Sequence, residues 1–238
     1  MIFLNLILIV VCALILGATA NWAIDVLPGW QNRPRGGRFD IRRVPHYSTL
    51  LWYLWRGGIC PHCGNERPKW LPVLELSLVV LFTFSAYLIR DELMLLLLIW
   101  LYSTFLLIVL VIDYKHRRVL NIMLGPAAII IFLLSFLPVT PEPLNALLGG
   151  VVGFGLFLLL ALVGRGAMGA GDVKLAGVIG LMTGFPGVLT ALIIGVLLAA
   201  IVAVFLLVSK RAGRKSTMAY APYLSLGALI ALLNMLVG

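Results

Sequence analysis

Two aspartates stand at the ends of apolar segments, and their side chains could act together on one water molecule. Asp172 closes the sequence Gly169-Ala170-Gly171-Asp172, and Asp113 directly follows an apolar stretch. Aspartates that hydrolyse peptides use one ionised carboxyl group to activate water and one protonated group to polarise the carbonyl. Two acids in one buried site cannot both ionise easily, because repulsion and burial raise the pKa of one of them. The titration belongs to the pair, so either aspartate could hold the proton.

Each aspartate also has a purely structural interpretation. Asp172 precedes an apolar run, so it could be an N-cap whose carboxylate accepts the N–H groups of Lys174 or Leu175. Asp113 could be an interfacial residue screened by the basic residues that follow it. An ionisable residue at the end of a lipid-embedded helix is a functional candidate by default. The two acids together therefore favour catalysis.

The elements that must position these acids are membrane helices. The chain has 238 residues, is 62% hydrophobic and only 11% charged, which excludes a soluble globular domain. We expect an all-α polytopic membrane protein with about eight transmembrane helices, the short segment 173–183 being the eighth. The expected segments are 2–20, 71–89, 93–112, 119–137, 144–163, 173–183, 188–208 and 220–237.

The basic residues predict the topology. They follow the first helix instead of preceding it, so this helix is an uncleaved anchor with its N-terminus outside. Alternation from there places all but Arg90 of the 18 Lys and Arg residues in the cytoplasm, together with Asp113 and Asp172. We divide the chain into an anchor (1–20), a cytoplasmic loop domain (21–70) and a membrane core (71–238). The net charge of +9 reflects topology and contact with anionic lipid, and does not indicate nucleic acid.

The residues around Asp172 could support the site. Gly169 and Gly171 would let a substrate strand approach closely, although a flexible connection explains them equally well. A phosphate loop is a weaker interpretation, because no strand precedes the glycines and no Gly-Lys-Ser/Thr follows. Lys174 could lower the pKa of Asp172 or orient the pair, or it could be a lysine that snorkels to the interface.

The segment 169–175 resembles the Gly-x-Gly-Asp signature of the type IV prepilin peptidase family. Further similar stretches are 17–22 with 27–28, 56–64, 71–76 and the proline at 222. The resemblance implies an eight-helix aspartyl protease of the bacterial inner membrane, with Asp113 and Asp172 as the catalytic residues. It would remove the basic leader of type IV prepilins or pseudopilins at the cytoplasmic face, after a glycine, without a cofactor. The client and the oligomeric state stay open.

The resemblance also implies a second activity, in which S-adenosylmethionine methylates the new N-terminus with the help of the first loop. Glu75, at the entry of the second helix, is a candidate participant. It could equally be a helix-terminus acid near the basic residues at 67 and 69.

The loop departs from the family pattern in its cysteines. Members with this loop commonly carry two Cys-x-x-Cys pairs that form a zinc site, whereas this chain has only Cys60 and Cys63. A structural zinc site needs four ligands, and Cys12 lies inside the first helix. His46 and His62 could complete a site, or two chains could share one, but we expect a loop held by packing. A lasting disulfide is not expected in the cytoplasm.

Other classes of membrane protein explain less. A transporter would show repeated halves and charges within its spans, and no internal repeat is visible. A membrane scaffold would leave the Gly-Ala-Gly-Asp sequence unexplained. A presenilin-type protease shares Gly-x-Gly-Asp, but its Pro-Ala-Leu sequence is absent here.

Overall fold

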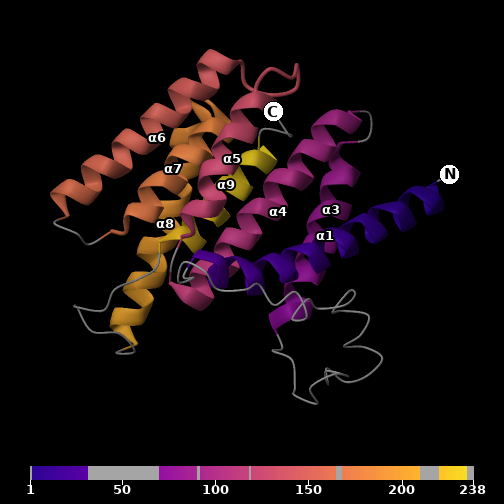
Figure 1. Ribbon diagram of the computed structural model, residues 1–238, viewed down its shortest axis with the longest axis horizontal. Helices are drawn as coiled ribbons and strands as arrows, with labels where there is room; N and C mark the ends of the chain where they lie inside the picture. The colour runs from indigo at the N-terminus through magenta and orange to yellow at the C-terminus, as the bar shows by residue number, and fades with distance from the viewer. Residues whose placement is uncertain are drawn as a thin grey trace. The chain divides into compact units, whose positions relative to one another are not determined.

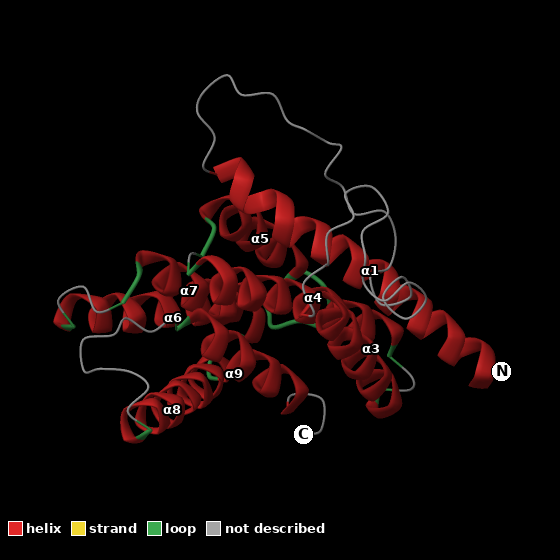
Figure 2. Ribbon diagram, turned by 90° about the horizontal axis from the view of Figure 1, so that it is seen from below, coloured by secondary structure: helices red, strands yellow, loops and turns green. Residues whose placement is uncertain are grey.

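The computed structural model describes residues 2–31, 70–89, 92–117, 119–164, 168–209 and 220–234. These residues form eight α-helices and no strand within the described ranges (Figures 1 and 2). The helices are α1 (Ile2–Gln31), α3 (Trp70–Leu88), α4 (Leu93–His116), α5 (Asn121–Leu134), α6 (Pro143–Val163), α7 (Ala170–Thr183), α8 (Gly187–Val208) and α9 (Ala221–Asn234).

Four stretches of helix are long and apolar enough to cross a membrane: Ile7–Ile24, Leu93–His116, Pro143–Val163 and Gly187–Val208. The apolar stretches in α3, α5 and α9 are shorter, with 10–17 residues. A helix overlaps each of the eight predicted segments, and α5 and α9 are shorter than the segments predicted there. The chain is therefore a helical membrane protein, as its composition predicts.

α1, α4 and α7 extend beyond the predicted bounds by more than one residue, and two of these extensions affect the aspartates. α1 continues to Gln31, past the expected end at residue 20, and Pro28 lies within it. α4 continues to His116, so Asp113 lies inside its last turns. α7 begins at Ala170, so Asp172 lies in its first turn. Most of the predicted loop domain, with Cys60 and Cys63, lies outside the described residues.

The chain divides into two compact units, residues 1–108 and 109–238, and α4 contributes to both. In the first unit α1 packs against α3. The rings of Phe82 and Trp100 stack with their centroids 4.4 Å apart. The Trp100 indole N–H donates to the Ser85 hydroxyl over 3.0 Å, so the buried indole has a hydrogen-bond acceptor.

The second unit is built around α7. Ten of its fourteen residues are buried, and it packs against α5, α6, α8 and α9. α6 and α7 lie side by side in both views (Figures 1 and 2). Because α7 is surrounded by other helices, a side chain in its first turn is held firmly in place.

Glycines allow the α6 and α7 backbones to touch. A Cβ atom on Gly180 would overlap the Gly149 carbonyl oxygen, and one on Gly153 would overlap the Ala176 carbonyl oxygen. Small residues let membrane helices approach closely, where van der Waals contacts replace the missing hydrophobic driving force. α7 ends at Gly184, whose φ of 63° suits a residue without a side chain.

Candidate active site

Asp113 lies near the C-terminal end of α4, which ends at His116, and is buried, with 4% of its surface exposed. Its Oδ2 atom has no hydrogen-bond partner among the described residues. The Asp113 carbonyl oxygen accepts the N–H group of Arg117 over 2.7 Å. Arg117 has a φ of 50°, and its left-handed conformation turns the chain at the end of α4. Asp113 therefore offers a carboxylate oxygen that the surrounding helices leave unsatisfied.

Asp172 is the third residue of α7 and is 8% exposed. Its Oδ2 atom accepts the N–H group of Gly169 over 3.3 Å, and the carboxylate also accepts the N–H group of Ala221, the first residue of α9. The N-cap interpretation of Asp172 is wrong, because Gly169 is the N-cap of α7. The carboxylate instead lies between the N-terminal ends of two helices, whose dipoles favour negative charge.

The two carboxyl groups interact with each other. Asp172 precedes the predicted membrane segment 173–183 and lies outside the four candidate spans. Its pKa is raised from 3.8 to about 6, first by burial and then by the charge of Asp113, while the N–H donors of Gly169 and Ala221 act in the opposite direction. A buried pair of this kind keeps one proton and one negative charge over a range of pH. It can therefore act as an acid and a base on the same water molecule.

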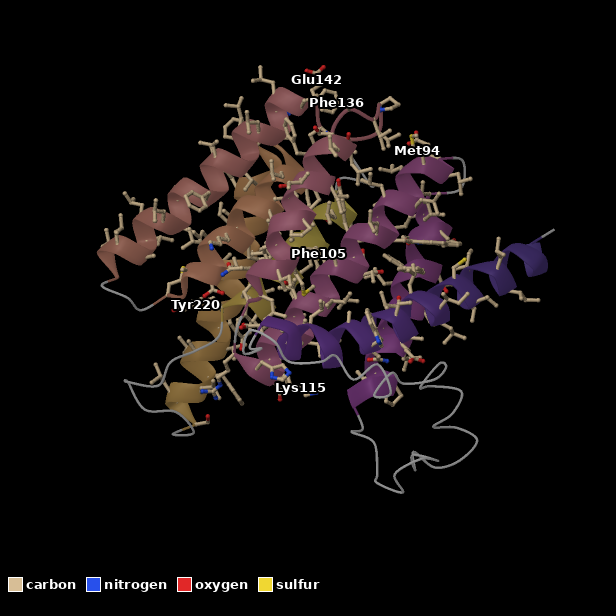
Figure 3. All side chains as sticks on the ribbon, in the orientation of Figure 1. Met94, Phe105, Lys115, Phe136, Glu142 and Tyr220 are labelled. Atoms are coloured by element: carbon tan, nitrogen blue, oxygen red, sulfur yellow. The ribbon has the colours of Figure 1, made fainter. Side chains whose placement is uncertain are left out.

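The site lies at one end of the second unit. Figure 3 labels Lys115, two residues after Asp113, and Tyr220, one residue before α9. Both lie toward the lower part of that view, whereas Phe136 and Glu142 lie at the top. The end of α4 and the beginning of α9 thus lie toward the same side of this unit.

The three residues predicted to support Asp172 have different environments. A Cβ atom on Gly171 would lie 2.7 Å from the Cβ atom of Val119, which is too close, whereas one on Gly169 would make an ordinary contact with Asp172 at 3.4 Å. The Lys174 ammonium donates to the side-chain amide oxygen of Asn121, Oδ1, over 2.8 Å. Gly171 and Lys174 therefore both contact the segment that leads into α5, and Gly169 supplies an N–H group.

Glu75 belongs to the first unit. It lies in α3, is completely buried, and its Oε1 atom accepts the side-chain N–H of Asn21 over 2.9 Å. A Cβ atom on Gly17 would lie 2.7 Å from Glu75 Cγ, so Gly17 leaves the space that this side chain fills. Glu75 is thus part of a buried polar contact between α1 and α3, and the basic residues at 67 and 69 lie outside the described residues.

Metal ligands do not gather in the described part of the chain, where no group of three or more His, Cys, Asp or Glu residues could hold an ion. Cys12 is a free thiol in α1. Cys60 and Cys63, the predicted metal candidates, lie outside the described residues.

Sequence reasoning missed three contacts around Asp172. The N–H group of Ala221 is a partner of Asp172 itself, whereas Val119 packs against Gly171 and the side-chain amide of Asn121 pairs with Lys174. One signal was present for Ala221, because Pro222 suits the first turn of a helix whose free N–H groups can bind an anion. Val119 and Asn121 carry no such local signal, since their partners lie some fifty residues further along the chain.

Comparisons with known proteins agree with this geometry. Residues 100–204, which include both aspartates, match the Type IV leader peptidase family. A prepilin leader peptidase/N-methyltransferase of Bacillus subtilis is 29% identical over 190 residues, which cover 77% of this chain and 74% of that protein. Proteins of the same name from Pseudomonas aeruginosa and Pseudomonas putida are each 28% identical over 77% of this chain and 65% of their own length. No solved structure matches the chain.

Proposed function

We propose that this chain, which belongs to the Type IV leader peptidase family, is a membrane aspartyl endopeptidase that cleaves the leader from type IV prepilins and prepilin-like proteins. The observation that carries the proposal is the interacting pair of buried carboxyl groups, Asp113 on α4 and Asp172 on α7. The substrate class follows from the names of the relatives.

The pair would divide the work of hydrolysis between its two members. The ionised carboxylate takes a proton from water, and the water oxygen attacks the carbonyl carbon of the scissile peptide. The protonated carboxyl group donates its hydrogen to the carbonyl oxygen and so stabilises the developing negative charge. The tetrahedral intermediate then collapses: the first aspartate passes the proton that came from water to the leaving nitrogen, the C–N bond breaks, and one hydroxyl of the intermediate returns its proton to the second aspartate as the carbonyl re-forms.

We place the site at the cytoplasmic face of the bacterial inner membrane, with eight spans and an external N-terminus. Within the described residues of the second unit, the Lys and Arg residues are Lys115, Arg117 and Lys174, and all three lie at the end that holds the aspartates. The acidic Glu142 lies toward the opposite end (Figure 3). Basic residues mark the cytoplasmic side of a membrane protein, which supports this orientation.

We further propose that the chain methylates the new N-terminus, as the names of its relatives suggest. S-adenosylmethionine would supply the methyl group. Glu75 is the candidate participant, because a fully buried carboxylate inside a membrane protein is a functional candidate, and its bond to Asn21 fixes its position. The loop domain 21–70 would contribute to this activity, and the membrane core 71–238 to proteolysis.

We expect the substrate to be recognised through its apolar helix and its backbone. The described charges near the aspartates include the cations of Lys115, Arg117 and Lys174, which do not attract a basic leader. Reversal of the leader's charges should therefore reduce cleavage less than substitutions beside the scissile bond. A stronger effect of charge reversal would contradict this mode of recognition.

The proposed function is tested with detergent-solubilised protein and a prepilin from the same genome, by following the shorter product on a gel. Asp113→Asn and Asp172→Asn should each abolish cleavage while the variants remain folded by circular dichroism and thermal unfolding. Gly155→Ala is the matched control, because a Cβ atom there meets nothing within 4 Å. Cleavage that persists in an Asp→Asn variant would remove that aspartate from the mechanism.

A further inference from the structure

The segment that joins α4 to α5 begins beside one aspartate and ends beside the other. It starts at Arg117, whose N–H group donates to the Asp113 carbonyl oxygen over 2.7 Å. It ends at Asn121, the first residue of α5. Among the described non-glycine residues, Arg117 alone has a positive φ, and this conformation ends α4.

The first contact of this segment with α7 lies immediately before Asp172. Val119 packs on the backbone of Gly171: a Cβ atom on Gly171 would lie 2.7 Å from Val119 Cβ, 3.3 Å from Cγ2 and 3.5 Å from Cα. The nearest of these atoms is attached directly to the backbone, so a rotation of the Val119 side chain would not relieve the overlap. Only glycine at position 171 allows this approach.

The second contact lies immediately after Asp172. The Lys174 ammonium donates to Asn121 Oδ1 over 2.8 Å. Both side chains are exposed, so this bond contributes little to overall stability. It nevertheless fixes the start of α5 against the first turn of α7, on the other side of Asp172 from Val119.

We infer that residues 119–121 form a positioning element that sets the separation of the Asp113 and Asp172 carboxyl groups, with Val119, Asn121 and Lys174 as its positioning residues. None of the three touches substrate in this proposal. The inference rests on the proposed function, because a shared proton requires a fixed separation of the two acids. Catalytic groups that are misplaced by about 1 Å lose roughly 100-fold in rate.

The first test measures cleavage and uses compensation between two residues. Gly171→Ala should lower kcat by about 10- to 100-fold and leave KM nearly unchanged, because the aspartates are displaced and the binding surface is not. Val119→Gly removes the opposing Cβ atom, so Gly171→Ala/Val119→Gly should recover much of the lost kcat. A double variant no better than Gly171→Ala would overturn the proposed contact.

The hydrogen bond has its own matched pair of variants. Asn121→Ala removes the acceptor of the Lys174 ammonium and should lower kcat several-fold, whereas Asn121→Asp keeps an acceptor and should retain most of the activity. Equal kcat values for Asn121→Ala and the wild type would remove this bond from the positioning element.

The pH profile separates positioning from simple destabilisation. When the two acids move apart, their repulsion weakens, and the pair loses its second proton at a lower pH. The alkaline limb of the kcat profile therefore shifts to lower pH. The other titratable groups on these elements include Tyr102, Tyr114, Lys115, His116, Arg117, Arg118, Lys174, Tyr220 and Tyr223. Gly171→Ala and Val119→Gly leave all of them in place. A variant whose kcat falls by the same factor at every pH, with the alkaline limb at its original pH, is only destabilised.

A second measurement does not depend on proteolysis. In a chain whose native cysteines are replaced by serine, Asp113→Cys and Asp172→Cys are linked with a short bifunctional thiol reagent, and the yield is compared between backgrounds. Gly171→Ala should lower the yield at least several-fold, and Val119→Gly should restore it. An unchanged yield refutes the positioning element even if the wild type cleaves prepilin. A wild type that does not cleave, with the expected change in yield, refutes only the proposed function.

Discussion

Gly180→Ala should destabilise the protein, because α7 cannot accept even one methyl group at this position. The added Cβ atom would overlap the Gly149 carbonyl oxygen and lie 2.5 Å from the Gly149 carbonyl carbon and 2.8 Å from the Gly150 nitrogen. All three are backbone atoms of α6, so no side-chain rotation relieves the overlap. The two helices must separate by several tenths of an ångström or more.

The magnitude follows from two opposing effects. Overpacking of this kind costs about 1–3 kcal/mol, and the separation also weakens neighbouring contacts such as that between Gly153 and Ala176. Alanine recovers up to about 1 kcal/mol through its higher helix propensity. We therefore expect a net loss of about 1–2 kcal/mol, which for a chain of this size lowers Tm by about 2–8 °C.

Gly155→Ala is the matched control, on α6 itself. A Cβ atom at Gly155 meets nothing within 4 Å, so only the gain in helix propensity applies and Tm should stay the same or rise. The assay is thermal unfolding in detergent, followed by tryptophan fluorescence and circular dichroism. The reasoning is refuted if Gly180→Ala unfolds at the same temperature as Gly155→Ala or at a higher one.

Four other predictions test the site. The pKa of Asp172 is raised to about 6, so the pair loses its last proton as the pH rises beyond this region, and kcat/KM for cleavage should decline there; a profile flat up to pH 9 would contradict a shared proton. Gly169→Ala should keep most of the cleavage activity, because its Cβ atom makes only an ordinary contact; a loss as large as that of Gly171→Ala would be unexpected. Glu75→Gln should reduce transfer of labelled methyl groups and spare leader cleavage, which a gel resolves in the same reaction. Purified protein should contain well below one zinc per chain by elemental analysis, whereas a stoichiometric content would show that Cys60 and Cys63 are ligands.

The sequence located the helices because lipid imposes a simple rule. Backbone groups in a bilayer must pair internally, so long apolar runs become helices. The bounds were less predictable where polar residues continue a helix. α1 extends through Asn21 to Gln31 although this part is not uniformly apolar and contains Pro28. Asp113 and Asp172 were visible because acids at helix ends in such a chain are conspicuous.

The contacts that hold the site were not predictable in the same way. Val119 with Gly171 and Asn121 with Lys174 join positions about fifty residues apart, and neither hydropathy nor turn preference specifies which residues meet. Glu75 shows the same limit. Its sequence position suggested a participant in methyl transfer or a helix-terminus acid, and neither interpretation indicated that its side chain is buried against α1 through Asn21 and Gly17.

The backbone contact between α6 and α7 has a consequence for how the enzyme can move. With the peptide planes at Gly149 and Gly180 touching, a lipid acyl chain cannot wedge into the seam, and neither helix can roll without carrying the other. Asp172 therefore belongs to a pair of helices that move together, and this pair is stiffer than the fourteen-residue helix α7 alone. Any opening that admits a substrate must therefore come from the other side of the carboxyl pair.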